Sequence, residues 1–437
     1  MSEQSCCRPR KKALGALELV AIALGGMVGG GIFTILGISV SMIGVYTPIA
    51  IAIGGGIAAL AAYSYIKLGV YYKDEGATYS FLKRSFPARP FAASLIGWWV
   101  IFGYISTLAL YAYTFSSYAI SSYSFAENEW IRKAVAGGII ALFTLINVWS
   151  VKGMGKVEDL MVYSKLFILA IISFVLVRHG QSSLPVLLKE SGDVPFYNIL
   201  VVASLTFVAY EGFQLVINAV DEMETPERNI PLATYTAIIL AVLIYVIIAI
   251  GALMAIPFKE IIENQEYALA AGAGQVLGHW GSDLIILGAL LATSSAISGT
   301  VFGASRQMAV IAQDGYFPVL LAKRKNNIPV NAILTMSVLA FCFILAGSLQ
   351  VILEFGSITF LLVSLLIAAT NHKMRQQTSS HAIFTTLSML GLLAGAIVLV
   401  GYKAMTQPEQ LFYIFGLYAF LTISAFAYVK RRNIVKH

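Results

Sequence analysis

The stretch Ala21-Ile22-Ala23-Leu24-Gly25-Gly26-Met27-Val28-Gly29-Gly30-Gly31-Ile32-Phe33 decides how the whole sequence is interpreted. It lies in an apolar run long enough to cross a membrane, yet five of the seven positions 25–31 are glycine. Each glycine in a helix interior costs about 1 kcal/mol relative to alanine. We therefore predict that the helix breaks here. The alternative is that these small residues only let helices pack closely.

The composition indicates that lipid surrounds this stretch. Of 437 residues, 58% are hydrophobic and only 12% are charged, whereas a soluble domain carries about 25% charged residues. The apolar runs are long and continuous, which favours membrane helices over a barrel. Three cysteines make no disulfide framework, and no nucleophile, metal or cofactor motif is evident. An enzyme, a metal protein and a nucleic-acid-binding protein are all disfavoured.

Twelve apolar segments approach the length of one membrane crossing, about 20 residues. The expected fold class is therefore an all-α integral membrane protein with 12 transmembrane helices. The longest polar stretches between the segments are residues 178–195 and 257–281. The predicted spans are residues 14–39, 46–66, 91–120, 131–150, 158–177, 196–219, 232–256, 282–311, 329–348, 351–370, 382–402 and 410–429.

The basic residues predict which loops face the cytoplasm. Over the predicted loops and tails, 20 Lys and Arg side chains fall on one side and six on the other. Cytoplasmic loops carry the excess of positive charge, so both termini are expected in the cytoplasm of a cell-membrane protein. The six on the outer side are Arg132, Lys133, Arg178, Lys189, Lys259 and Lys403. Another three, Lys67, Lys165 and Arg306, fall within or at the ends of spans.

The sixth span carries a carboxylate near its middle, in Ser204-Leu205-Thr206-Phe207-Val208-Ala209-Tyr210-Glu211-Gly212-Phe213-Gln214. An ionisable residue inside a membrane span is expensive and by default marks a functional site. Gly212 beside Glu211 permits a second break. The alternative is a neutral glutamic acid that serves only as a polar tether between helices.

The fifth span contains Lys165, about two turns from its cytoplasmic end and too deep to reach the surface easily. Because burial disfavours a charged side chain, such a lysine can gain and lose a proton near neutral pH. It could then couple proton movement to conformation. The alternative is a fixed ammonium paired with carbonyls or with a carboxylate.

The two glycine-interrupted spans lie five apart in the chain. Interrupted segments at matching positions in two halves are typical of transporters built from inverted repeats. Spans one to five (13–178) and six to ten (196–371) would form the halves, although we find no clear residue similarity between them. Helices 11 and 12 (381–430) follow, and residues 1–12 and 431–437 are expected to be cytoplasmic tails.

From about residue 12 to 430, the chain resembles the amino acid–polyamine–organocation permeases. Val28-Gly29-Gly30-Gly31-Ile32-Phe33 is similar to the first-helix motif of that family, and Ala209-Tyr210-Glu211-Gly212-Phe213 to its sixth-helix segment. The loop from Asp221 to Pro231 is similar to the family's loop after that helix. Ser294-Ser295 and the segment from Ala304 through Pro318 match a pattern of its eighth helix.

The resemblance implies the leucine-transporter fold, with 5+5 inverted repeats, broken helices 1 and 6, and alternating-access transport of an amino acid or polyamine. It places the substrate carboxylate at Val28, Gly29, Gly30 and Gly31. It places the α-amino group at the backbone carbonyls of Phe207, Val208 and Ala209, with Glu211 nearby. Lys165 matches a lysine of sodium-independent members, and its expected neighbours are the first-helix break and Ser294 and Ser295.

Two positions depart from the family pattern. Gly30 stands where many members have Ser or Thr, so a hydroxyl donor to the carboxylate is missing and backbone groups must suffice. Glu211 stands where several general amino acid carriers have an apolar residue, and some carriers of cationic substrates have a glutamate. Glu211 could favour a basic substrate or carry a proton.

These observations predict a proton-coupled amino acid permease whose partners are an amino acid, protons and the lipid bilayer. Phe207 is a candidate for an aromatic gate over the substrate, and Tyr104 on the third span is a second candidate. The main alternative is an amino acid or polyamine exchanger without net proton coupling. A channel or receptor is disfavoured, because neither rings of pore-lining charge nor a sizeable soluble domain is evident.

Overall fold

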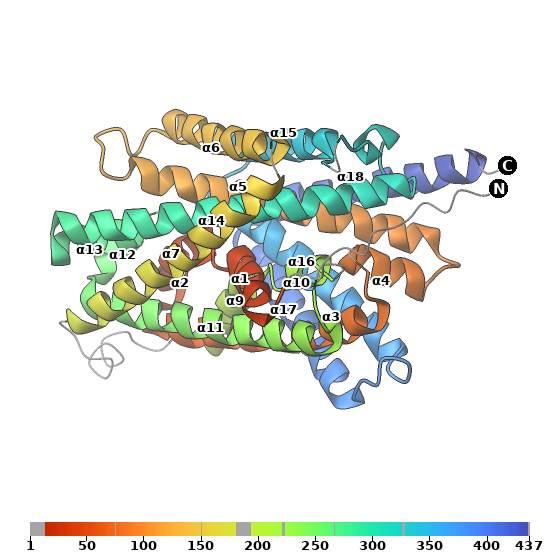
Figure 1. The fold of residues 1–437 in the computed structure, drawn as a ribbon. Helices are drawn as coiled ribbons and strands as arrows, with labels where there is room; N and C mark the ends of the chain where they lie inside the picture. The colour runs from red at the N-terminus through yellow and green to blue at the C-terminus, as the bar shows by residue number, and fades with distance from the viewer. Residues whose placement is uncertain are drawn as a thin grey trace.

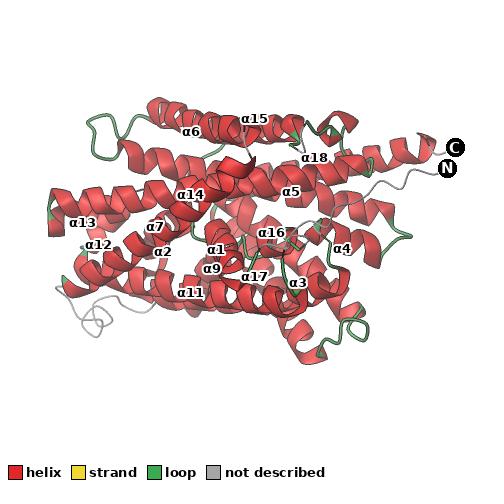
Figure 2. Cartoon of the chain, viewed as in Figure 1, coloured by secondary structure: helices red, strands yellow, loops and turns green. Residues whose placement is uncertain are grey.

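The protein forms a bundle of helices (Figure 2). The computed structural model describes residues 14–74, 76–149, 151–180, 194–220, 223–265, 267–325 and 328–435, and within these ranges it contains no β-strand. The predicted all-α class is thereby confirmed. The predicted N-terminal tail, residues 1–12, lies outside the described residues.

The helices of the N-terminal part run from the first predicted span to the fifth. They are α1 (Ala16–Met27), α2 (Gly30–Ile43), the 3₁₀-helix η1 (Gly44–Tyr46), α3 (Thr47–Tyr72), α4 (Ala77–Ser85), α5 (Pro90–Ile120), α6 (Glu129–Trp149) and α7 (Val151–Arg178).

The helices of the C-terminal part begin with the sixth predicted span. They are α9 (Phe196–Thr206), the 3₁₀-helix η2 (Phe207–Tyr210), α10 (Leu215–Asn218), α11 (Pro226–Ala255), α12 (Phe258–Glu263), α13 (Ala268–Leu277), α14 (His279–Gln313), η3 (Val319–Ala322), α15 (Val330–Ala346), α16 (Leu349–Lys373), α17 (Ala382–Thr406) and α18 (Pro408–Val435).

Ten helices among the described residues are long and apolar enough to cross a membrane, one of them a continuous unit, Gly30–Tyr72, made of α2, η1 and α3. Two shorter apolar helices, α1 and α15, accompany them. Large apolar side chains such as Phe174, Ile239 and Phe426 are exposed along their outer faces, as expected where lipid is the solvent. The count of twelve crossings, the inverted repeats and the orientation of the termini stay predictions.

In Figure 1, α1, α10 and α16 lie near the centre of the bundle, between α6 and α15 on one side and α11 on the other. The helices α5 and α9–α10 are buried over almost their whole length, whereas α17 and α18 are exposed over most of theirs. Residues 23–40, which contain the glycine stretch, are also all buried, as is Glu211, so both predicted anomalies lie in the interior of the fold.

Three predicted non-helical stretches contain helices instead. The predicted polar stretch 257–281 includes α12 and α13, because Leu269, Ala270 and Ala273 provide an apolar face that is buried. The loop between the second and third predicted spans contains α4. The predicted C-terminal tail from residue 431 continues α18 as far as Val435. Most of the other polar stretch, residues 181–193, lies outside the described residues.

Candidate functional site

The first span is interrupted at two residues. Helix α1 ends at Met27 and α2 begins at Gly30, with Val28 and Gly29 between them. Val28 leaves helical geometry at ψ 75°, and its N–H still bonds to the Leu24 carbonyl, while the Gly29 N–H bonds to the Met27 carbonyl. Gly30 and Gly31 form the first turn of α2. The interruption is therefore shorter than the run of glycines.

Glycines on both sides of the interruption and within it allow other helices to approach closely. A Cβ atom on Gly31 would lie 2.9 Å from Ala209 Cβ, and one on Gly29 would lie 2.6 Å from Ala296 Cβ. A Cβ on Gly26 would lie 3.2 Å from Gly212 Cα. The two interpretations of the glycine stretch thus both apply, because the same segment contains a break and packs against the sixth and eighth spans.

Gly30 lacks a side chain for a reason visible in its neighbour Thr114 on α5. A Cβ on Gly30 would lie 2.9 Å from both Cβ and Oγ1 of Thr114. The Thr114 hydroxyl is 2.6 Å from that of Thr34 and donates to the Leu110 carbonyl at 2.8 Å. In this chain a threonine of another helix occupies the space that a Ser or Thr at position 30 would need.

Lys165 on α7 is fully buried and reaches the first break. Its ammonium donates to the carbonyls of Gly25 (3.0 Å) and Val28 (2.7 Å) and to Ser295 Oγ (2.9 Å). The carbonyls at a helix C-terminus have no intrahelical donor and favour a nearby positive charge. Lys165 therefore caps the end of α1. Of the two serines expected beside this lysine, Ser295 supplies a hydroxyl.

Two tyrosines satisfy the other carbonyls at the end of α1. Tyr111 OH from α5 donates to the Gly26 carbonyl at 3.1 Å, and Tyr245 OH from α11 donates to the Met27 carbonyl at 2.8 Å. Neither tyrosine was identified from the sequence. A tyrosine in an apolar span looks like packing, and its partners here lie 85 and 218 residues away.

The sixth span is interrupted over a longer stretch. Helix α9 ends at Thr206 and narrows into η2, and a turn from Glu211 to Gln214 precedes the short α10. Gly212 adopts φ +125°, a backbone conformation that side-chain-bearing residues rarely adopt. Its amide donates to Gln214 Oε1 at 3.1 Å. The glycine beside the carboxylate is thus required by the turn.

Glu211 is buried, with 2% of its surface exposed. Gln214 Nε2 donates to Glu211 Oε2 at 2.6 Å and to Tyr104 OH at 3.0 Å. Glu211 Oε1 has no hydrogen-bond partner within the described part of the chain. The carboxyl group is therefore held at one oxygen, with its other oxygen available to a further donor.

The two interruptions meet at Tyr245, whose hydroxyl donates to the Ala209 carbonyl (3.1 Å) as well as to Met27. Phe207, Val208 and Ala209 are all buried, and Ala209 lies against Gly31 of the first break. The Val208 carbonyl accepts from the Glu211 N–H at 3.1 Å. Because a carbonyl has two lone pairs, Val208 and Ala209 can each accept one more donor.

The arrangement brings together most of the residues predicted for the site. Gly31 lies directly against Ala209, and Lys165 contacts both Val28 and Ser295. Within the ranges described above, no group of three or more His, Cys, Asp or Glu residues could hold a metal ion. The site offers backbone donors, backbone acceptors, one ammonium and one carboxyl group.

Comparison with known proteins agrees with this architecture. A model of the amino acid permease family matches residues 14–426. The inner membrane transport protein YbaT of Escherichia coli is 29% identical over 428 residues, covering 97% of each chain. The branched-chain amino acid permease BcaP of Bacillus subtilis is 24% identical over 395 residues, 83% of this chain and 82% of the relative.

A mammalian relative is also similar along most of its length. Cationic amino acid transporter 4 of Mus musculus is 25% identical over 448 aligned positions, 94% of this chain and 68% of the relative. The family model spans nearly every described helix, including both interruptions. The chain is a multi-pass membrane protein that belongs to the amino acid permease family.

Proposed function

We propose that this protein is a secondary active amino acid transporter that works by alternating access and couples uptake to protons. The observation that carries the proposal is the position of Lys165, whose ammonium holds two carbonyls on either side of Met27 and a hydroxyl of α14. A titratable group therefore links three helices at the first break.

The two interruptions offer complementary ends for a zwitterion. The first turn of α2 begins at Gly30, and its N–H groups have no acceptor within their own helix, so they suit a carboxylate. The carbonyls of Phe207, Val208 and Ala209 suit an ammonium. Glu211 Oε1 is the additional acceptor at this end, and it would take either a basic substrate group or a proton.

Loss of a proton from Lys165 would change the first break directly. A charged lysine has three N–H donors for its contacts with the Gly25 carbonyl, the Val28 carbonyl and Ser295 Oγ. A neutral amine has only two, and it loses the charge that favours the carbonyl end of α1. One contact among α1, α7 and α14 must then weaken, so the two protonation states favour different arrangements of these helices.

The substrate would first be chosen by thermal-shift binding against the twenty amino acids and common polyamines. Uptake of the best binder into proteoliposomes would then be measured with and without a pH gradient. We expect a gradient, acidic outside, to drive accumulation. An exchanger would give no accumulation with the gradient, while substrate loaded inside strongly accelerates uptake, and that result would contradict symport.

Lys165→Ala tests the lysine separately. We expect this variant to lose the pH dependence of transport and to retain part of its substrate binding. The matched control is Lys259→Ala, which removes an exposed lysine that pairs with Glu263 at 3.8 Å. Unchanged pH dependence in Lys165→Ala would remove this residue from the coupling mechanism.

A further inference from the structure

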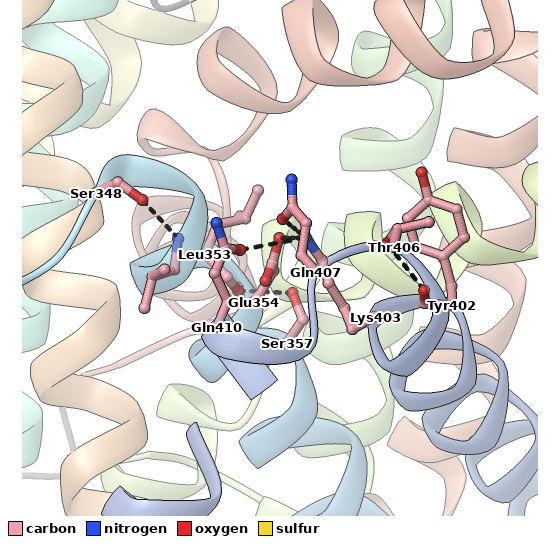
Figure 3. Close-up of polar contacts among 10 residues, drawn as sticks. Ser348, Leu353, Glu354, Ser357, Tyr402, Lys403, Thr406, Gln407 and Gln410 are labelled. Atoms are coloured by element: carbon pink, nitrogen blue, oxygen red, sulfur yellow. Dashed lines mark hydrogen bonds and ion pairs between the residues drawn. The ribbon is translucent and has the colours of Figure 1, made fainter. Parts of the chain in front are cut away.

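A second buried lysine lies outside the site. Lys403 on α17 forms an ion pair with Glu354 on α16, and the two side chains are 3% and 0% exposed (Figure 3). The sequence placed Lys403 in an outer loop, which is wrong because α17 continues to Thr406. Glu354 lies inside the predicted span 351–370, and the sequence analysis does not single it out.

The surroundings of Lys403 satisfy its ammonium from three segments. Besides Glu354, it donates to Gln407 Oε1 at 2.6 Å and to Gln410 Oε1 at 3.4 Å. Gln407 lies between α17 and α18, and Gln410 lies in the first turn of α18. Lys403 therefore joins the end of α17 and the start of α18 to the first turns of α16.

Stability alone does not explain such a pair. Removing two charges from water costs several kcal/mol for each ion, and well-packed apolar residues in their place are often neutral or stabilising. Ionisable residues within membrane spans are rare and by default mark function. The pair holds the start of α16, so its role depends on which residues that part of α16 contacts.

The turn of α16 that carries Glu354 contacts the sixth-span interruption. Ser357 Oγ, three residues later, lies 3.0 Å from the Leu205 carbonyl on α9 and 2.9 Å from the Leu353 carbonyl of its own helix, and these two acceptors share its one proton. A Cβ on Gly356 would lie 3.4 Å from Val208 Cγ2. On the other side of Glu354, the Ile352 carbonyl accepts from Ser106 Oγ at 2.6 Å.

Helix α17 also contacts α9 directly. Tyr197 OH donates to the Val398 carbonyl at 3.1 Å. A Cβ on Gly395 would lie 3.2 Å from Ser204 Oγ. Helix α17 is thus attached both to α9 and, through Lys403, to α16.

We propose that Glu354 and Lys403 are positioning residues that hold the first turns of α16 in place, so that Ser357 and Gly356 set the position of Leu205 and Val208 beside the substrate amine. The inference rests on the proposed transport function. Among the residues that the structure describes, these two side chains contact each other, and Lys403 also contacts Gln407 and Gln410, none of which belongs to the site. Without the pair, the carbonyls of the second break lose part of their support, and substrate binding weakens more than turnover.

The test uses the double substitution Glu354→Met with Lys403→Met, which removes both charges and keeps side-chain volume. Because it leaves no buried charge unpaired, we expect thermal stability at or above that of the wild type. We expect KM for the best-binding amino acid to rise roughly tenfold with the maximal rate nearly unchanged, as loss of binding alone predicts. Lys403→Arg keeps the ion pair and should keep the wild-type KM.

Ser357→Ala provides a second and milder variant, because it removes only the hydroxyl that reaches Leu205. It should raise KM in the same direction even if the double variant fails to fold. Wild-type KM in Ser357→Ala, or in a stable double variant, would overturn the positioning role. Wild-type protein that neither binds nor transports any of the twenty amino acids would instead overturn the proposed function, and this inference with it.

Discussion

The two helix interruptions are held in different ways. At the first, the carbonyls at the end of α1 are satisfied by Lys165, Tyr111 and Tyr245, which come from α7, α5 and α11. At the sixth span, the turn from Glu211 to Gln214 is satisfied largely by its own side chains and peptide groups. Side chains of other helices contact the carbonyls that precede this turn, Tyr245 at Ala209 and Ser357 at Leu205.

The first break therefore depends on side chains of neighbouring helices, whereas the turn of the second depends mainly on its own residues. Because side chains of other helices stabilise the first break, a second substitution on one of those helices should alter the effect of a substitution at the break. The turn at residues 211–214 of the second break depends on the conformation of a few consecutive residues, so a change within that turn should resist such rescue. The following predictions test this contrast.

Gly212→Ala should have the largest effect. The added Cβ would lie 2.5 Å from the carbonyl carbon of Gly26, and φ +125° disfavours any side chain. We expect transport to be lost and the free energy of unfolding to fall by about 3 kcal/mol. Thermal unfolding in detergent and uptake into proteoliposomes would measure both.

The matched control is Gly56→Ala in α3, where an added Cβ meets no heavy atom within 4 Å. Alanine there should keep transport and raise stability by up to about 1 kcal/mol, because it favours the helix. Equal stability of the Gly212 and Gly56 variants would show that neither the φ of Gly212 nor its close approach to Gly26 fixes the second break.

Gly30→Ser should have an intermediate effect that a neighbour can reverse. The new Cβ would lie 2.9 Å from Thr114, so we expect a loss of about 2 kcal/mol from overpacking. Adding Thr114→Ala should restore stability and part of the uptake. If the double variant is no better than Gly30→Ser alone, the first break does not depend on Thr114 in the way described.

Tyr245→Phe and Tyr111→Phe should have the smallest effects, each on the order of 1 kcal/mol for a lost hydrogen bond. The Tyr245 variant should be the more destabilised, because its hydroxyl contacts two carbonyls and that of Tyr111 contacts one. Parallel thermal unfolding of the two variants gives the order. The reverse order would argue against Tyr245 as the link between the interruptions.

The sequence predicted those features that show as local anomalies. Three adjacent glycines and the pair Glu211-Gly212 stand out in apolar spans, and the structure interrupts helices at both. The neighbours of Lys165 followed from family resemblance, and two of the three expected contacts, the break and Ser295, are present. The roles of these residues in binding and coupling stay predictions.

Features that depend on which helices become neighbours could not be predicted. Thr114, Tyr111 and Tyr245 are ordinary residues of long apolar segments until α5 and α11 pack against the first break. Glu354 and Lys403 are 49 positions apart in the chain, and only the packing of α16 against α17 joins them. Helix ends were also hard to predict. Helix α17 is four residues longer than its predicted span, so Lys403 is a buried helical residue and not part of a loop.

The hydroxyl of Tyr245 has a consequence of its own. It carries one proton but has two acceptors, the Met27 and Ala209 carbonyls, at 2.8 and 3.1 Å. The two interruptions therefore compete for a single donor. If a substrate ammonium binds at Ala209 as proposed, it would release that proton entirely to Met27, and rotation of one O–H bond would then communicate occupancy at one helix to the other.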